Sequence, residues 1–458
     1  MSLMQNSGIP RMLSRFENLV TLADRILAPF VSKTFALRHP LTRVDWVVAI
    51  PLMLLAVAET IWAINQMGTL IWHATTFNLW FEADTPRVIA NWTEATSNQY
   101  RSSVHPLTPA TLTTTVVAME KLGIPPMTAV HLLLSAVAAA STGLCLIVLR
   151  LLDLPRTVAV AFTAVFLGSA GFIYWAAVPE LGSSAMLTIF LGLVLLLASR
   201  AHGTVVWVLV GAATMGITVT NWSVGLIAAL VRTGLRRTLR IALATIAFVV
   251  IASVLQLALF PSAGMLSYKL MDEYRWTQVK AAASNTGVWD PVASVRSLMI
   301  TTYSATFVKL EQHTDTVVVT NQRAGLFDRT TLGRAVAVGW AALLALGAYG
   351  LWSRPDRRSV ALGISLILAF QLLLHSVYGD PTFLYAPHFL PILIVIAGSS
   401  WFTRARWAVV VVAAFVVIAG FVDNSQQFRV AINLAETVID DGGNPIHPSY
   451  PPGGALLP

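Results

Sequence analysis

The sequence predicts an all-α protein that crosses a membrane about eleven times. This prediction rests first on the amino-acid composition. Hydrophobic residues make up 56% of the 458 residues and charged residues only 11%, whereas soluble domains contain about 25% charged residues. The apolar residues gather in segments that approach the ~20 residues needed to cross a ~30 Å hydrocarbon layer. A chain this long and this apolar cannot hide its hydrophobic surface in water.

The N-terminal segment, residues 1–44, is predicted to be cytoplasmic and to contain an amphipathic helix. Within residues 11–33, apolar side chains recur every three or four positions from Met12 to Phe30, and the arginines lie elsewhere around the helix. Such a helix either lies on an anionic membrane surface or packs on the cytoplasmic loops of its own chain. We expect no cleavable signal peptide, because this segment lacks an early apolar stretch with a cleavage site.

A membrane domain is predicted over residues 45–422, and its spans follow from the apolar segments. They are residues 45–66, 127–149, 157–178, 181–199, 204–220, 222–235, 240–260, 332–352, 359–378, 386–402 and 406–422. Residues 107–122 contain many threonines and end before Gly123 and Pro125, so we expect a short helix there, flat on the outer membrane surface.

The arginines predict the orientation of the chain. With the N-terminus inside, every short inner loop contains arginine, and the short outer loops contain almost no Lys or Arg. This pattern predicts a multi-pass membrane protein with two long outer loops, residues 67–126 and 261–331, and an outer C-terminal tail, residues 423–458. We expect the membrane to be a bacterial inner membrane and the outer (periplasmic) loops to be helical. The net charge of +8 is divided among these short clusters, which argues against a nucleic-acid partner.

The first outer loop contains the sequence FEADTPRV, in which Glu82 and Asp84 lie beside aromatic residues. Arg87 follows three residues after Asp84. A carboxylate in a partly apolar pocket has a raised pKa, and a nearby arginine lowers it, so this combination suits a general base. The alternative is a solvated loop carboxylate that pairs with Arg87.

A second acidic motif, VPELGSS, places Glu180 in the predicted outer turn between two spans. A turn between two helices needs polar residues in any case, so a purely structural role is the alternative. Glu59 lies inside the first span, where it either faces an outer cavity or hydrogen-bonds a neighbouring helix.

A third motif, HSVYGDPTFLYAPHF, concentrates hydrogen-bonding and aromatic side chains around another outer turn. Its candidates for substrate contact are Tyr378, Asp380, Tyr385 and His388, because such side chains suit contact with sugar or phosphate. An aromatic belt at the membrane surface explains the tyrosines equally well. His388 is also explained as a core histidine whose hydrogen bonds are satisfied.

Cations in the two long outer loops are candidates for binding a lipid phosphate. Lys269 and Arg275 lie in the second loop, and Arg101 and His105 lie in the first. Arginine binds phosphate through two parallel hydrogen bonds. The sequence has no G-x-x-x-x-G-K-[ST] loop and no H-E-x-x-H motif, so neither an ATP-driven pump nor a zincin is expected. The lone Cys145 excludes an intramolecular disulfide and a Cys-rich metal site.

The order of these motifs resembles the GT-C superfamily of integral-membrane glycosyltransferases, which includes protein mannosyltransferases and aminoarabinose transferases. In that family a first span is followed by a large outer loop with an acidic residue and surface helices, here FEADTPRV and then SSVHPLTPATL. A second acidic motif follows the third span, where VPELGSS stands, and a long outer loop follows the seventh. The family often has two adjacent acids in its first motif, whereas Ala83 separates Glu82 from Asp84 here.

The resemblance implies an inverting transfer of sugar from a polyprenyl-phosphate donor to a glycan, lipid or protein acceptor. Asp84, with Glu82 as the alternative, would deprotonate the acceptor hydroxyl. Glu180 would orient the acceptor or help to hold a divalent cation such as Mg²⁺ or Mn²⁺. The donor phosphate would be bound by Arg87, Arg101, Lys269 and Arg275, with His105 and His388 sharing that task.

Three other classes remain as alternatives. A secondary transporter or flippase has polar residues near the membrane midplane and broken helices, which Gly211, Gly216 and Asn221 would fit. An O-antigen polymerase or ligase would use arginine-rich outer loops. A non-catalytic membrane scaffold would tolerate the substitution Asp84→Asn.

Overall fold

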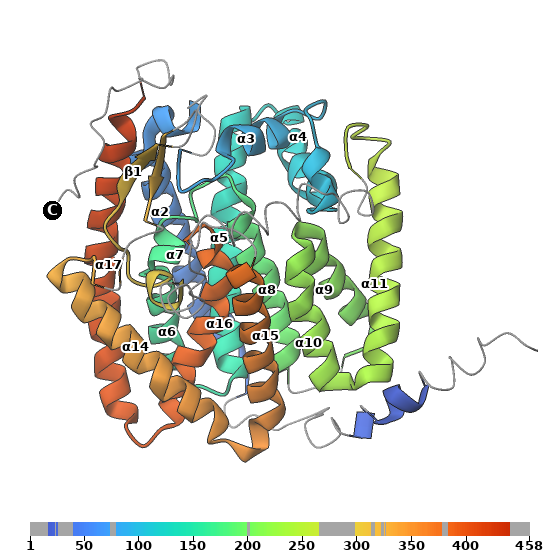
Figure 1. Cartoon of the computed structure of the whole chain (residues 1–458), viewed down its shortest axis with the longest axis vertical. Helices are drawn as coiled ribbons and strands as arrows, with labels where there is room; N and C mark the ends of the chain where they lie inside the picture. Colours follow the sequence, from blue (N-terminus) through green and yellow to red (C-terminus); the bar gives the residue numbers. More distant parts are fainter. Residues whose placement is uncertain are drawn as a thin grey trace, which may run out of the picture.

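The computed structural model describes residues 17–22, 24–25, 40–73, 79–198, 202–264, 298–312, 317–321, 325, 327–377 and 383–439. This part of the chain is mostly helical, and seven of its helices are long and apolar enough to cross a membrane. The class predicted from the sequence, a helical polytopic membrane protein, agrees with this architecture. Figure 1 shows the long helices running side by side, with short elements at one end of the bundle.

All eleven predicted spans overlap with helices, but four of these helices are short. The long helices are α2 (Arg43–His73), α5 (Pro126–Leu151), α11 (Leu235–Gln256), α14 (Thr331–Trp352), α15 (Arg358–Val377), α16 (Ala386–Ser399, extended by the 3₁₀ turns η6 Phe383–Tyr385 and η7 Ser400–Phe402) and α17 (Arg406–Glu436). The short ones are α6 (Arg156–Leu167), α8 (Leu181–Leu197), α9 (Thr204–Ile217) and α10 (Trp222–Thr233). At about 1.5 Å per residue, the short helices are shorter than a ~30 Å hydrocarbon layer, and this accounts for the difference between seven and eleven.

The third predicted span, residues 157–178, is not one continuous helix. Helix α6 ends at Leu167, Ser169 has an extended backbone, and a single turn, α7 (Ala170–Ile173), follows. The backbone N–H of Gly171 donates to the carbonyl of Thr302 at 2.8 Å, and a Cβ at Gly171 would lie 3.0 Å from that oxygen. The break therefore depends on contact with a segment far away in the sequence.

The first outer loop forms short helices at one end of the bundle, as predicted for residues 107–122. Helix α3 (Thr85–Thr93), the 3₁₀ turn η2 (Tyr100–Ser103), the π-helical turn η3 (Pro109–Thr113) and α4 (Thr114–Lys121) follow one another there. Figure 1 places α3 and α4 over the upper end of α5. Residues 107–122 are thus helical in the structure, and their position on a membrane surface stays a prediction.

The second outer loop corrects the prediction that the fold and its outer loops are entirely helical. Strands β1 (Lys309–Gln312) and β2 (Val317–Thr320) form an antiparallel pair in which Lys309 faces Thr320. Three consecutive valines with branched Cβ atoms favour the extended conformation in β2. Helix α17 extends to Glu436, so the first part of the predicted tail, residues 423–458, is helical.

The turns that the arginines assign to the inside meet at one end of the bundle, which we call the basic end. There Asp45 pairs with Arg150 at 2.8 Å and with Arg156 at 2.9 Å, and Asp153 pairs with Arg354 at 3.5 Å. The described parts of the turns assigned to the outside gather at the opposite end, which we call the site end. Inner and outer turns are therefore separated as the arginines predict, and which end faces the cytoplasm stays a prediction.

The described part of the N-terminal segment, residues 17–22 and 24–25, is helical and contacts the basic end. The carboxylate of Asp24 accepts a hydrogen bond from the backbone N–H of Leu235 at 2.6 Å. This contact favours the second of the two alternatives for the segment, a helix that packs on a cytoplasmic loop of its own chain.

Candidate functional site

The first acidic motif follows a strained turn at the site end. The backbone N–H of Phe81 donates to the carbonyl of Val319 at 3.0 Å, which ties the turn to strand β2. Phe81 and Glu82 have φ angles of 48° and 64°, in the left-handed region that residues other than glycine rarely adopt. Backbone strain of this kind persists only where the surrounding structure enforces it, and it concentrates at functional sites.

Asp84 precedes helix α3, but its side chain does not cap that helix. An aspartate in this position usually accepts a hydrogen bond from a free N–H of the first turn. Here Oδ2 instead accepts hydrogen bonds from Arg87 Nη2 at 2.6 Å and from Arg101 Nη2 at 3.0 Å. The carboxylate thus joins two guanidinium groups from different elements, α3 and η2, and leaves Oδ1 for other partners.

Glu180 connects the second acidic motif to the first. It precedes helix α8, where Oε1 accepts the backbone N–H of Leu181 at 2.9 Å. Oε2 accepts the backbone N–H of Asp84 at 3.2 Å. Two carboxylates separated by almost a hundred positions in the sequence therefore lie side by side.

The two carboxylates have opposite pKa shifts. For Asp84, burial raises the pKa, but the charges and hydrogen bonds of Arg87 and Arg101 outweigh burial and lower the pKa overall. For Glu180, burial is the largest influence and raises the pKa, and the nearby Asp84 charge adds to it, while Arg87, the N–H of Leu181 and Arg101 only partly compensate. Asp84 is thus held as an anion, and Glu180 takes up a proton more readily.

Arg101 is supported by a buried hydrogen-bond network in the preceding loop. Gln99 donates from Nε2 to the carbonyl of Asn91 at 2.7 Å, and Ser102 donates to the carbonyl of Gln99 at 2.8 Å. Burial would lower the pKa of Arg101, but the negative charge of Asp84 raises it. The buried Nε of Arg101 has no hydrogen-bond partner within the described structure, so this guanidinium has a free donor.

His105 lies beside Arg101 as a neutral ring with a defined tautomer. Its Nδ1 lies 2.8 Å from the carbonyl oxygen of Ile217, which can only accept, so Nδ1 carries the proton and Nε2 is an acceptor. The pKa of His105 is lowered to about 3. Burial is the main cause, the hydrogen bond to Ile217 opposes it, and the charges of Arg101, Arg87 and His388 add to it. The ring therefore stays uncharged at neutral pH.

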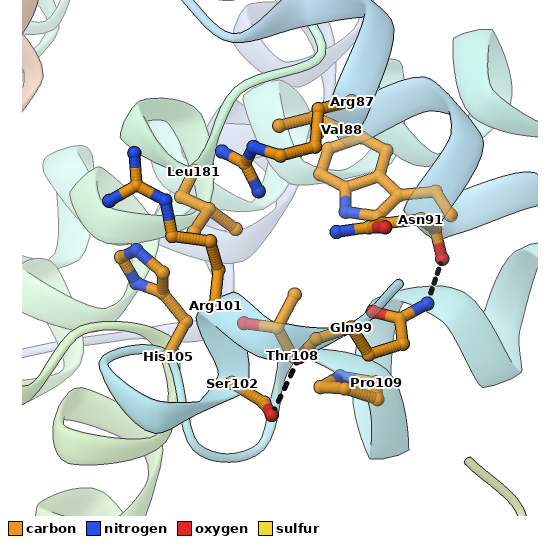
Figure 2. A pocket seen from close by; sticks show the side chains of 11 residues that line it. Arg87, Val88, Asn91, Gln99, Arg101, Ser102, His105, Thr108, Pro109 and Leu181 are labelled. Carbon is orange, nitrogen blue, oxygen red and sulfur yellow. Dashed lines mark hydrogen bonds between the residues drawn. The ribbon is translucent and has the colours of Figure 1, made fainter. Parts of the chain in front are cut away.

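These side chains surround a pocket at the site end. Figure 2 shows the guanidinium groups of Arg87 and Arg101 extending to the same side, with the ring of His105 next to Arg101. Asn91, Gln99 and Ser102 are also in the lining. The cavity volume is about 20 Å³, which is room for a water molecule. A larger ligand would have to displace lining side chains such as that of Arg101, which is 38% exposed.

A second polar cluster lies deeper between helices. His388, in the first turn of α16, lies with Nδ1 2.9 Å from Oδ1 of Asn221, which ends the 3₁₀ turn η4 (Val219–Asn221). The His375 ring lies 4.0 Å from the Tyr385 ring and 5.8 Å from the His388 ring, centroid to centroid. The predicted contact residues Tyr385 and His388 thus lie together, beside His375.

A divalent cation at this site stays a prediction. Among the described residues, no group of three or more His, Cys, Asp or Glu side chains is arranged to hold a metal ion. Asp84, the central carboxylate, already carries two guanidinium groups on one oxygen. A metal ion next to it would be repelled by both of these charges.

Five of the predicted site residues come together in one place. Asp84, Glu180, Arg87, Arg101 and His105 form a connected group, and three of them line the pocket.

The other predicted residues have different outcomes. Glu82 is half-buried on the same turn and does not line the pocket. Four further candidates, namely Lys269, Arg275, Tyr378 and Asp380, lie outside the described residues.

Sequence reasoning missed the residues that support the site. Asn91 and Gln99 lie in a segment that resembles an ordinary loop, and Asn221 is predicted only as a marker of a broken helix in a transporter. His375 is the first residue of the third motif, whereas Gln371 lies inside a predicted span and outside every predicted motif. The amide of Gln371 gives the clearest signal that could have been used, because a polar side chain in the middle of an apolar span is costly and often functional.

Comparison of the chain with family models, with curated proteins and with solved structures found no match.

Proposed function

We propose that this protein is a membrane glycosyltransferase that moves a sugar from a polyprenyl-phosphate donor to an acceptor on the outer face of a bacterial inner membrane, with inversion. The observation that carries the proposal is the group at the site end, where Arg87 and Arg101 share the carboxylate of Asp84 beside a second carboxylate, Glu180. Anion-binding and proton-accepting groups thus lie within reach of one another.

The arginines suit the leaving group of such a reaction. A polyprenyl-phosphate sugar is a phosphodiester with one negative charge, and loss of the sugar leaves a monoester that carries two. Arg87 and Arg101 would interact more strongly with the growing charge than with the intact donor, which is the condition for catalysis. Both arginines line the pocket, and the Nε of Arg101 has no hydrogen-bond partner within the described structure.

The transfer itself needs one proton acceptor. The acceptor hydroxyl gives its proton to a carboxylate, its oxygen forms a bond to the anomeric carbon, and the bond from that carbon to the phosphate oxygen breaks. The electron pair of that bond goes to the phosphate. Asp84 has the free oxygen Oδ1 for this proton, whereas Glu180 has the raised pKa that favours protonation. The pH dependence described in the Discussion distinguishes the two.

A secondary transporter is the rival class, and the position of the charges favours it less. Transporters bind substrates and ions near the membrane midplane. Asp84, Arg87, Arg101 and Glu180 lie outside the candidate spans, at one end of the bundle. An enzyme that binds its lipid donor at the membrane surface needs its charged groups at that surface.

The test is sugar transfer by the purified protein in detergent. Radiolabelled polyprenyl-phosphate sugars are offered with a membrane glycolipid extract to the wild type, to Arg101→Gln and to a matched control, Arg334→Gln. Arg334 is an exposed arginine whose Nε donates to the carbonyl of Phe327. We expect transfer by the wild type and the control, and a loss of about 10²–10³-fold in Arg101→Gln. Equal transfer by both variants, or no wild-type transfer from a panel of donors, contradicts the proposal.

A further inference from the structure

The deeper polar cluster consists of Asn221, Gln371, His375 and His388. Each of these side chains is at most 9% exposed. Asn221 ends the turn that leads into α10, Gln371 and His375 lie one helical turn apart on α15, and His388 lies in α16. Helix α15 contacts both α10 and α16. The four residues thus come together from three helices.

Most of the hydrogen-bonding capacity of this cluster is unused. Within the described structure, Nδ2 of Asn221, both amide atoms of Gln371 and both ring nitrogens of His375 have no hydrogen-bond partner. Buried polar atoms without partners lower the stability of a protein, and leucine at the same positions would avoid that cost. A cluster of this kind therefore indicates a ligand that supplies the missing hydrogen bonds.

The cluster is linked to the arginine pocket through His105 and the segment that follows Ile217. His105, in the pocket wall, bonds to Ile217, and four residues later Asn221 contacts His388 at 2.9 Å. Close packing of α8 on α16 brings Glu180 to the same place, because a Cβ at Gly182 would lie 2.9 Å from Pro387. A ligand whose charged group binds Arg101 would thus extend toward His388.

The chemistry of the cluster is that of uncharged hydrogen-bonding groups. Its members supply two amides and two imidazoles, and the rings that contact His375 in the described structure are Tyr385, His388 and Phe389. A charged imidazole buried without a carboxylate partner would be costly, so the histidines are neutral. Each sugar hydroxyl both donates and accepts a hydrogen bond, and the Tyr385 ring offers an apolar surface to the C–H groups of a sugar.

We propose that Asn221, Gln371, His375 and His388 form the subsite for the hydroxyl groups of an uncharged sugar ring, while Arg87 and Arg101 hold the phosphate of the same lipid. This inference rests on the proposed function and deepens it, because it names the class of sugar. A sugar with an ammonium or carboxylate group would find no counter-charge among these four side chains.

The test compares the binding of three lipids to the purified protein: polyprenyl phosphate, a polyprenyl-phosphate hexose and a polyprenyl-phosphate aminosugar. We expect the wild type to bind the hexose lipid at least ~10-fold more tightly than polyprenyl phosphate. A gain of this size corresponds to the contribution of a small number of hydrogen bonds. Gln371→Leu should abolish this gain, leave binding of the phosphate unchanged, and leave the thermal midpoint unchanged or raised. His375→Leu is the second variant, and Gln427→Leu, at a buried glutamine of α17, is the matched control.

Three results overturn the subsite. The first is that Gln371→Leu and His375→Leu both still bind the hexose lipid ~10-fold more tightly than polyprenyl phosphate. The second is that the wild type binds the aminosugar lipid as tightly as the hexose lipid. The third is a fall of the thermal midpoint in Gln371→Leu with the gain intact, which would assign the cluster to structural waters. Failure of the proposed function looks different, because the wild type would then bind none of the three lipids.

Discussion

The two ends of the bundle each hold an aspartate between two arginines, yet the two groups differ in which hydrogen-bonding atoms remain available to a ligand. At the basic end Asp45 is 0% exposed, and both of its oxygens are used: Oδ1 accepts from Arg150 and Arg156, and Oδ2 accepts from the N–H and hydroxyl of Thr42. At the site end the side chain of Asp84 is 22% exposed, and both guanidinium groups meet on Oδ2 alone.

This difference shows that an ion pair is a candidate binding site when some of its hydrogen-bonding atoms have no partner. Its charge alone is not sufficient. The side chain of Arg150 also donates to the carbonyls of Leu154 and Pro40, so it holds the turn between α5 and α6 against the start of α2. Arg101 keeps a free donor next to a pocket. The basic end therefore has the properties of a structural clamp, and the site end those of a binding site.

The largest expected effect is on stability, at the basic end. Asp45→Asn removes the charge between two arginines, and Arg150 stays buried without its partner. Breaking a buried pair in this way costs about 3–5 kcal/mol. We expect a corresponding fall in the unfolding midpoint of the purified protein in detergent.

The matched control is Asp356→Asn at the same end. The side chain of Asp356 is 52% exposed and pairs with Arg354 at 2.7 Å. An exposed pair contributes only about 0–1 kcal/mol. If both variants lose the same stability, the basic end is not a buried clamp.

The second prediction concerns the site end, where we expect a large effect on sugar transfer and a small effect on stability. Asp84→Asn releases the two guanidinium groups from their shared carboxylate, so we expect sugar transfer to fall by about 10²–10³-fold. The side chains of Asp84 and Arg101 are 22% and 38% exposed, so the loss of stability should be smaller than in Asp45→Asn. The measurement is the transfer rate together with the unfolding midpoint of the same preparation. A loss of stability as large as that of Asp45→Asn would make Asp84 a structural residue.

The sequence predicted the parts of the site that depend on local spacing. Arg87 follows Asp84 by one helical turn, so their contact is visible in the sequence, and the alternation of basic and non-basic loops brings Glu180 to the same end. The arginine pattern also predicted that the turns of the basic end meet.

The remaining features depend on contacts between segments far apart in the chain. The break after α6 needs the carbonyl of Thr302, and the bridge at Trp80 needs Val319 of a strand pair that is too short to be recognised from periodicity. The cluster around Gln371 forms only when α15 packs against α10 and α16. No single segment contains that information.

The third effect is a shift of the pH profile. A base works only when ionised, so transfer falls as the pH drops through the pKa of the base in the folded protein. Arg87 lowers the pKa of both Asp84 and Glu180, and its removal in Arg87→Gln should move the acidic limb to higher pH by about one unit or more. Arg334→Gln should leave the limb in place.

The position of the wild-type limb identifies the base. Asp84 has its pKa lowered from 3.8, so an Asp84 base predicts a limb below that pH. Glu180 has its pKa raised from 4.5, so a Glu180 base predicts a limb above that pH. The stability contributions have opposite signs: that of Asp84 is lost as the pH falls through its lowered pKa, and that of Glu180 is lost as the pH rises through its raised pKa.

The smallest effect is expected at His105, which lies between the arginine pocket and the deeper cluster. With a pKa of about 3 the ring does not titrate between about pH 5 and 8. The amide of Asn in His105→Asn can still donate to the carbonyl of Ile217, and it removes only the acceptor Nε2. The loss of one neutral hydrogen bond predicts a fall in transfer of about tenfold or less, with the acidic limb of the pH profile unchanged.

The pH profiles of Arg87→Gln and His105→Asn together show which group transfers the proton. If His105 were a general acid or base, its substitution would remove a limb near the ordinary histidine pKa of about 6.5, which no other group of the pocket would replace. A limb that disappears in His105→Asn would therefore assign proton transfer to the imidazole. An unchanged profile with a modest loss of rate would leave proton transfer to the carboxylates and assign the neutral ring to hydrogen bonding with the ligand.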